Sequence, residues 1–246
     1  MVEAGKRDGT DAPFEFMGVS PFELLVGGVA VRLLWSRGPI ASGTFAWIGV
    51  ALFMAAILWP SSLVAWLLTA ALAFALILVL RGYARSGALL FAGLAAWEVW
   101  NAVLEPAAAG GLLALDANAV AGVLSALRDG VMRSGNVVGA PEGHRIVILM
   151  GCSTAHFLPL SILGAAALLL VRGERLGRAA FLGLAALAIA LVAMNVTRLS
   201  LLAWSADLYH VVHGPTGATI FDTVASLMIV TAALVIPTRP QEACPC

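Results

Sequence analysis

Residues 179–204 read AAFLGLAALAIALVAMNVTRLSLLAW, a stretch in which the single charged side chain is Arg198. About 20 apolar residues in a helix cross the hydrocarbon core of a bilayer, which is roughly 30 Å thick. A helix also pairs its backbone polar groups internally, as lipid requires. This stretch therefore predicts a membrane-spanning helix.

Six other stretches meet the same criterion, so we expect an all-α polytopic membrane protein with about seven transmembrane helices. Pro60 predicts a tight turn between the second and third helices, because a proline ends the helix before it. The predicted spans are residues 18–35, 41–59, 61–80, 87–104, 147–171, 179–204 and 217–236, forming one transmembrane domain (17–236) between a polar N-terminal tail (1–16) and a C-terminal tail (237–246).

Composition supports this class and excludes others. Hydrophobic residues make up 61% of the chain and charged residues 11%, which is about half the charged fraction of soluble domains. The formal net charge is zero, so the electrostatic term that drives nucleic-acid binding is missing. Three cysteines are too few for a disulfide framework. The first fifteen residues lack an apolar core, so we expect the first span to direct its own insertion.

Basic residues predict the orientation, because they concentrate in cytoplasmic loops. They follow the third span and fill the turn between the fifth and sixth spans: Arg81, Arg85, Arg172, Arg175 and Arg178. Placing both loops inside the cell puts Cys152, Arg198 and His213 at the extracytoplasmic face of the cytoplasmic membrane.

The long outer stretch before the fifth span contains two predicted elements. Residues 112–132 carry apolar side chains at helical spacing and predict an amphipathic helix at the membrane interface. Turn residues at 134–139 and 141–144, followed by the β-prone segment 145–148, predict a small hairpin that leads into the fifth span.

Cys152 is the candidate nucleophile. A cysteine reacts as its thiolate, which an apolar site disfavours unless a cation is near. Arg198 is a candidate for that cation, since an arginine inside a span costs about 2.5 to 3.5 kcal/mol and usually serves an interior partner or a function. Asn195 shares its helical face. The alternatives are a buried apolar cysteine and an arginine that extends to the headgroups.

His213 is the candidate acid/base group. It begins the turn sequence His213–Gly217, and imidazole suits proton transfer near neutral pH. His210 and His156 compete for this role, and a solvated loop histidine is the alternative. No His-Glu-x-x-His motif occurs, so we predict neither a metal site nor another cofactor.

The order Cys152-Ser153, then Asn195-x-x-Arg198, then His213-x-x-x-Gly217-x-x-x-Phe221 resembles the exosortase/archaeosortase family of membrane transpeptidases. The resemblance extends over the membrane body, and its specific motifs lie within residues 134–221. Thr154 and Ala155 follow Ser153 where many members have glycine.

The resemblance implies a cysteine protease or transpeptidase of the cell envelope. Its substrates would be exported proteins that end in a short sorting motif, a single span and a basic tail. Cys152 would form a thioester, Arg198 would stabilise the thiolate or the oxyanion, and His213 would transfer protons to the leaving amine and from the acceptor. Asn195 and Ser153 would support them, and the acceptor would be a lipid, another amine or water.

A non-catalytic transporter or channel component is the rival interpretation. Glu98, Asn101 and Glu105 share a face of the fourth span and, with Arg198, would line a polar path. The chain shows no inverted repeat or pair of broken spans, which are typical of transporters. A scaffold protein without catalysis is the other alternative, provided that Cys152 is dispensable.

Overall fold

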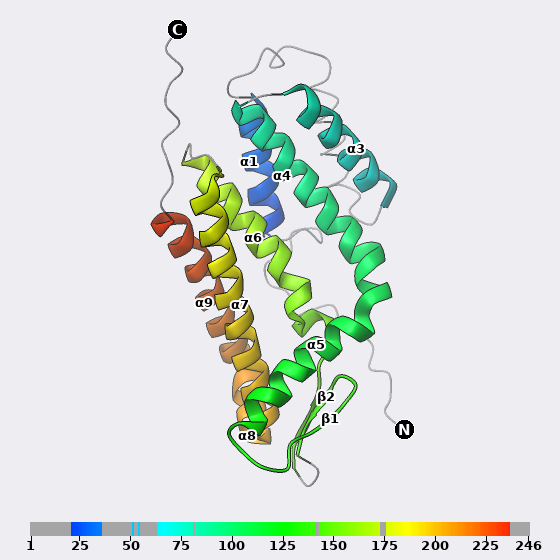
Figure 1. Ribbon diagram of the computed structural model, residues 1–246, viewed down its shortest axis with the longest axis vertical. Helices are drawn as coiled ribbons and strands as arrows, with labels where there is room; N and C mark the ends of the chain where they lie inside the picture. Colours follow the sequence, from blue (N-terminus) through cyan, green and yellow to red (C-terminus); the bar gives the residue numbers. More distant parts are fainter. Residues whose placement is uncertain are drawn as a thin grey trace. The chain divides into compact units, whose positions relative to one another are not determined.

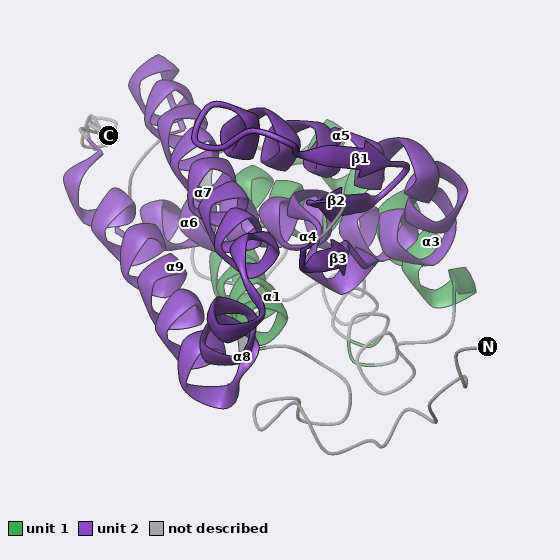
Figure 2. Ribbon diagram, turned by 90° about the horizontal axis from the view of Figure 1, so that it is seen from below, with its two compact units in different colours: residues 1–92 green, residues 93–246 purple. Residues whose placement is uncertain are grey.

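A computed structural model of the chain describes residues 21–35, 51, 54, 63–80, 82–140, 143–172 and 176–236. These residues are mostly helical, with one small sheet (Figure 1). They belong to two compact units, residues 1–92 and 93–246 (Figure 2). The predicted second span and both predicted tails lie outside the described residues, apart from positions 51 and 54.

Unit 1 contains α1 (Pro21–Trp35), α3 (Leu63–Val79) and the first half of α4 (Gly82–Val99). A Cβ at Gly87 would lie 2.8 Å from the carbonyl oxygen of Ala30, so α1 and α4 pack closely enough to require glycine there. Ala84, Ala88 and Leu80 form a buried apolar cluster. Within the described residues, the predicted first and third spans correspond to α1 and α3.

Unit 2 contains a group of three helices: α6 (Thr154–Val171), α7 (Arg178–Trp204) and α9 (Pro215–Val235), each of which packs against the other two. The short helix α8 (Ala206–His213) connects α7 to α9. The exposed side chains of α9 include Ile220, Leu227 and Leu234, which recur every two turns and share one face. This apolar face suits contact with lipid.

Four helical stretches within the described residues are long and apolar enough to cross a membrane: Ala84–Ser125, Thr154–Val171, Arg178–Trp204 and Pro215–Val235. The stretch Leu63–Leu78 is a shorter apolar helix. This architecture fits the predicted all-α, multi-pass membrane protein.

The predicted fourth span and the predicted amphipathic helix form one continuous helix. It runs from α4 through a π-helical turn, η2 (Trp100–Leu104), into α5 (Glu105–Ser125). The amphipathic helix thus begins and ends about seven residues before the predicted range 112–132. Pro106 has no N–H to donate to an α-helical hydrogen bond. The turn before it is π-helical, because the N–H of Glu105 donates to the oxygen of Trp100, five residues earlier.

The predicted hairpin is present and gains a third strand. Antiparallel strands β1 (Met132–Ser134), β2 (Val137–Gly139) and β3 (Arg145–Val147) form a sheet in that order. The N–H of Ile148 donates to the oxygen of Asn136 at 2.9 Å and extends this pairing. The predicted fifth span therefore begins later than residue 147, since α6 starts at Thr154.

The sheet, α5, α7 and α8 share one apolar cluster, which we call the lower core. Its members are buried side chains from all four parts: Ala117, Val120, Leu124, Val138, Ile146, Ile148, Leu199, Leu202, Ala203 and Val212. Cys152 packs directly against the lower core, and Ile148 belongs to that core just before it in the chain.

Gly217→Ala tests the close approach of α8 and α9. An added Cβ would overlap the backbone oxygens of Val211 and Val212, so we expect a destabilisation of about 1 to 3 kcal/mol and a lower melting temperature in detergent. Gly122→Ala is the matched control, because nothing lies within 4 Å of its Cβ position and alanine favours a helix by about 1 kcal/mol. Equal melting temperatures for the two variants would contradict the close packing.

Candidate active site

Cys152 lies in a tight turn between the sheet and α6. The turn is the 3₁₀ segment η3 (Met150–Cys152), in which the N–H of Cys152 donates to the oxygen of Leu149 at 2.9 Å. Ser153 caps α6, and its hydroxyl accepts from the N–H of Ala155 at 3.3 Å. Cys152 is half-buried and immediately precedes the cap. Cys152 therefore lies directly at the amino-terminal end of α6.

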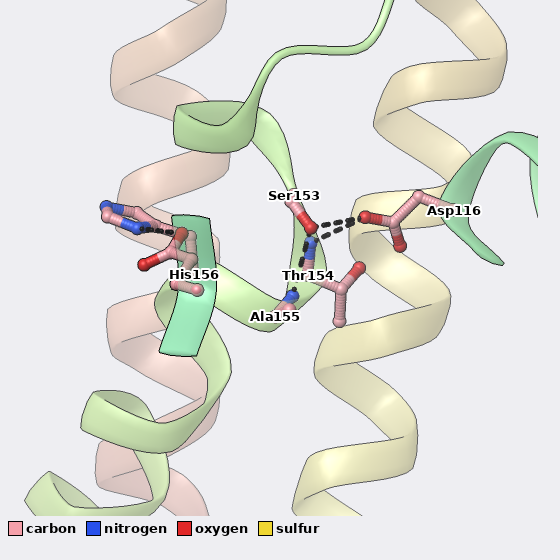
Figure 3. Close-up of polar contacts among 6 residues, drawn as sticks. Asp116, Ser153, Thr154, Ala155 and His156 are labelled. Carbon is pink, nitrogen blue, oxygen red and sulfur yellow. Dashed lines mark hydrogen bonds and ion pairs between the residues drawn. The ribbon is translucent and has the colours of Figure 1, made fainter. Parts of the chain in front are cut away.

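Asp116 of α5 holds this turn from one side (Figure 3). Its Oδ2 atom accepts from the hydroxyl of Ser153 at 2.7 Å and from the N–H of Thr154 at 3.0 Å. Both Asp116 and Ser153 are buried, with exposed fractions of 8% and 0%. The carboxylate thus satisfies one free N–H at the start of α6 and fixes the rotamer of the capping serine.

Asn195 of α7 holds the same turn from a second helix. Its Nδ2 atom donates to the oxygen of Cys152 at 3.1 Å and to the hydroxyl of Thr154 at 3.0 Å. An amide nitrogen carries two N–H donors, so both are used by the turn. Asn195 thereby positions the backbone of Cys152. It supports that residue through the backbone.

Arg198 lies one helical turn beyond Asn195, a rise of about 4.5 Å along α7. Its guanidinium carbon is 5.6 Å from the centre of the Phe221 ring of α9. Its Nε atom is buried without a hydrogen-bond partner, and no carboxylate pairs with the guanidinium among the described residues. A cation in this environment is well suited to receive an anion.

His213 is the exposed last residue of α8, and its ring stacks on Tyr209. The ring centroids are 4.9 Å apart and the planes differ by 27°. Tyr209 also contacts His210 and His144, at 5.8 and 5.3 Å between centroids. His210, the first alternative acid/base group, is exposed on the same short helix.

Each of the three predicted site residues is connected to the lower core, either directly or through an aromatic ring. Cys152, Tyr209 and Phe221 all pack against it, and the two rings are the partners of His213 and Arg198. No hydrogen bond joins Cys152, Arg198 and His213 in the described part of the chain. The structure thus brings the supporting residues together, and the roles of the three remain predictions.

His156, the other alternative acid/base group, projects from the first turn of α6 on the side away from Asp116 (Figure 3). Its Nδ1 atom lies 2.9 Å from Oε1 of Glu105. Sequence reasoning placed Glu105 with Asn101 on one face of a span but did not pair it with His156. The two residues are 51 positions apart, so only tertiary packing reveals the pair.

Among the described residues, no group of three or more His, Cys, Asp or Glu side chains is arranged to hold a metal ion. The arrangement instead offers a thiol at a helix start, an arginine without an anionic partner and several histidines. These are the elements of nucleophilic acyl transfer.

No protein-family model, curated protein or solved structure matches the chain. Its function is therefore inferred from its own side chains.

Asp116→Ala tests the support of the cysteine turn. Two buried donors, the Ser153 hydroxyl and the Thr154 N–H, would lose their acceptor, at about 1 to 3 kcal/mol each. We expect a lower melting temperature and faster alkylation of Cys152, measured with Cys244 and Cys246 replaced by serine. Asp129→Ala is the control, since Asp129 is exposed. If both variants behave like the parent, Asp116 does not hold the turn.

Proposed function

We propose that this protein is a membrane-embedded cysteine transpeptidase similar to the exosortase/archaeosortase family. It would cleave the C-terminal sorting signal of an exported protein and transfer the new carboxyl end to an acceptor. The supporting observation is that Asn195 holds the backbone of Cys152 one helical turn from Arg198, a half-buried cation with no carboxylate partner among the described residues.

In the first half-reaction the Cys152 thiolate attacks the scissile carbonyl carbon. A C–S bond forms, the C–N bond breaks, and the leaving amine takes a proton from the His213 imidazolium. The products are a thioester on Cys152 and a free amine. Dividing acyl transfer into two steps lowers the barrier that each step must cross.

Arg198 stabilises the negative charge in this step. The charge begins on the sulfur and moves to the carbonyl oxygen as the tetrahedral intermediate forms. A guanidinium that already lacks its full complement of hydrogen bonds needs little reorganisation to accept that oxygen. Phe221 restricts the guanidinium to one side of its ring through the cation–π contact.

The proposed topology has about seven spans, with the basic loops inside and the site at the extracytoplasmic face of the cytoplasmic membrane. The support is the distribution of arginines in the sequence and the position of Cys152 at the opposite end of α6 from Arg172. The substrate would arrive laterally, since its own span lies in the same bilayer.

The transporter or channel alternative requires Glu98, Glu105 and Arg198 on one polar path. In the structure Glu105 pairs with His156, while Arg198 contacts Phe221. These separate partners favour the peptidase.

Cys152→Ala is expected to abolish processing, because no other atom of the site would replace the sulfur as nucleophile. The measurement is accumulation in the membrane of full-length exported proteins that end in a span and a basic cluster. Cys244→Ser with Cys246→Ser is the control and should process normally. Normal processing by Cys152→Ala would exclude the proposed function.

Arg198→Lys keeps the charge but loses the planar donors of the guanidinium. We expect thioester formation to slow by roughly 10² to 10³, the usual effect of removing an oxyanion donor. Arg133→Lys is the matched control, since the Arg133 side chain is exposed and donates to the oxygen of Gly135. A rate equal to that of the control would show that Arg198 does not contact the developing oxyanion.

A further inference from the structure

Glu105 is the centre of a hydrogen-bonded group at the start of α5. Its side chain is 5% exposed, and both carboxylate oxygens have partners. Oε1 lies 2.9 Å from Nδ1 of His156. With the Asn101 amide oriented to suit its neighbours, Nδ2 donates to Oε2 of Glu105 at 2.7 Å, and Oδ1 accepts from Nε1 of Trp97 at 3.3 Å.

The π-helical turn η2 makes this group possible. It widens the helix at residues 100–104, directly between Trp97 and Glu105, and such turns are frequent at functional sites. Trp97 also contacts His156, because the centroids of their two rings are 5.8 Å apart. Glu105 and the His156 ring are therefore held by two neighbours, Trp97 and Asn101, which lie on the same continuous helix as Glu105.

The pairing determines which atom of His156 exchanges protons. Because Nδ1 donates to the carboxylate, Nε2 is the nitrogen that remains to accept a proton. The His156 side chain is 43% exposed. Among the described residues, His156 is the histidine that pairs with a carboxylate. A carboxylate that orients the imidazole and stabilises the imidazolium is the usual support of a histidine base.

His156 also belongs to the turn that carries the nucleophile. Its N–H donates to the oxygen of Ser153 at 3.1 Å, and Ser153 directly follows Cys152. Asp116 and Asn195 therefore fix the backbone of both residues. Figure 3 shows His156 and Asp116 on opposite sides of the α6 start.

We propose that His156, positioned by Glu105, is the general base of the second half-reaction, and that the acceptor is a primary amine. This inference rests on the proposed function. The acceptor first gives one proton of its ammonium form to water. The free amine nitrogen then attacks the thioester carbonyl, a C–N bond forms and one N–H proton passes to Nε2 of His156. The C–S bond then breaks and the Cys152 thiolate is regenerated. The partly exposed imidazolium releases its proton to water, from which the exposed His213 is reprotonated.

The surroundings favour an amine as acceptor. An amine in water is largely an ammonium ion, and the negative charge of the Glu105 carboxylate beside His156 attracts a cation. The separation of two histidines also gives each half-reaction its own proton carrier. His213 serves the departing amine near the lower core, and His156 serves the arriving amine on the other side of the turn.

The test follows a single turnover. The substrate is an affinity-tagged form of an exported protein that accumulates uncleaved in Cys152→Ala cells. In His156→Gln membranes we expect the thioester to form at a rate within a few-fold of the parent. Its decay should slow by roughly 10²-fold, the usual contribution of a general base. Glu105→Gln should slow the decay to a smaller extent, because the imidazole remains but loses its anionic partner.

Hydroxylamine distinguishes a missing base from a distorted site. It attacks thioesters without a general base, so adding it should release the trapped substrate from His156→Gln as the hydroxamate at the parent's rate. Asp207→Asn, an exposed acid on α8, should turn over normally. Parent-like decay in His156→Gln, or failure to form the thioester, would overturn the assignment to the second half-reaction. Processing by Cys152→Ala would instead reject the proposed function itself.

Discussion

The Asp116 carboxylate is the constraint on which the site depends. A charged group in an apolar core is costly unless strong donors surround it, and here the donors are the cap and the first free N–H of α6. These contacts therefore give the Asp116 carboxylate its hydrogen-bond donors. They also fix the point at which the connection from the sheet ends and α6 begins. Asn195 adds the contact that fixes the Cys152 carbonyl. Two helices distant in sequence thus define a single turn.

Much of the fold follows from local patterns. The long apolar runs at 179–204 and 217–236 correspond to α7 and α9 within about two residues, because lipid requires a helix wherever such a run occurs. The glycine and asparagine at 135–136 correctly predict a hairpin, since they suit its turn. These features depend on neighbouring residues alone, which is why sequence reveals them.

Other features depend on distant partners, and sequence reasoning missed them. Asp116 lies among the apolar residues of an amphipathic helix, and nothing in the local pattern shows which groups it binds. Its position on the buried face of that helix was the one indication of a buried polar partner. The Glu105–His156 pair could not be found from spacing, because it joins two helices. The continuity of α4 and α5 was hidden by Pro106, which usually marks a break but is tolerated in the first turn of a helix. Tyr209, the stacking partner of His213, carried no motif at all.

The continuous helix over residues 84–125 has a consequence for where chemistry takes place. Its 42 residues correspond to about 63 Å measured along the helix path, roughly twice the hydrocarbon thickness of a bilayer. One straight crossing needs only about half of that length. Glu105 and Asp116 both lie on this helix and are shielded from water by protein. The burial of these two carboxylates is thus set by the packing of the protein itself, at whatever depth of the membrane they lie.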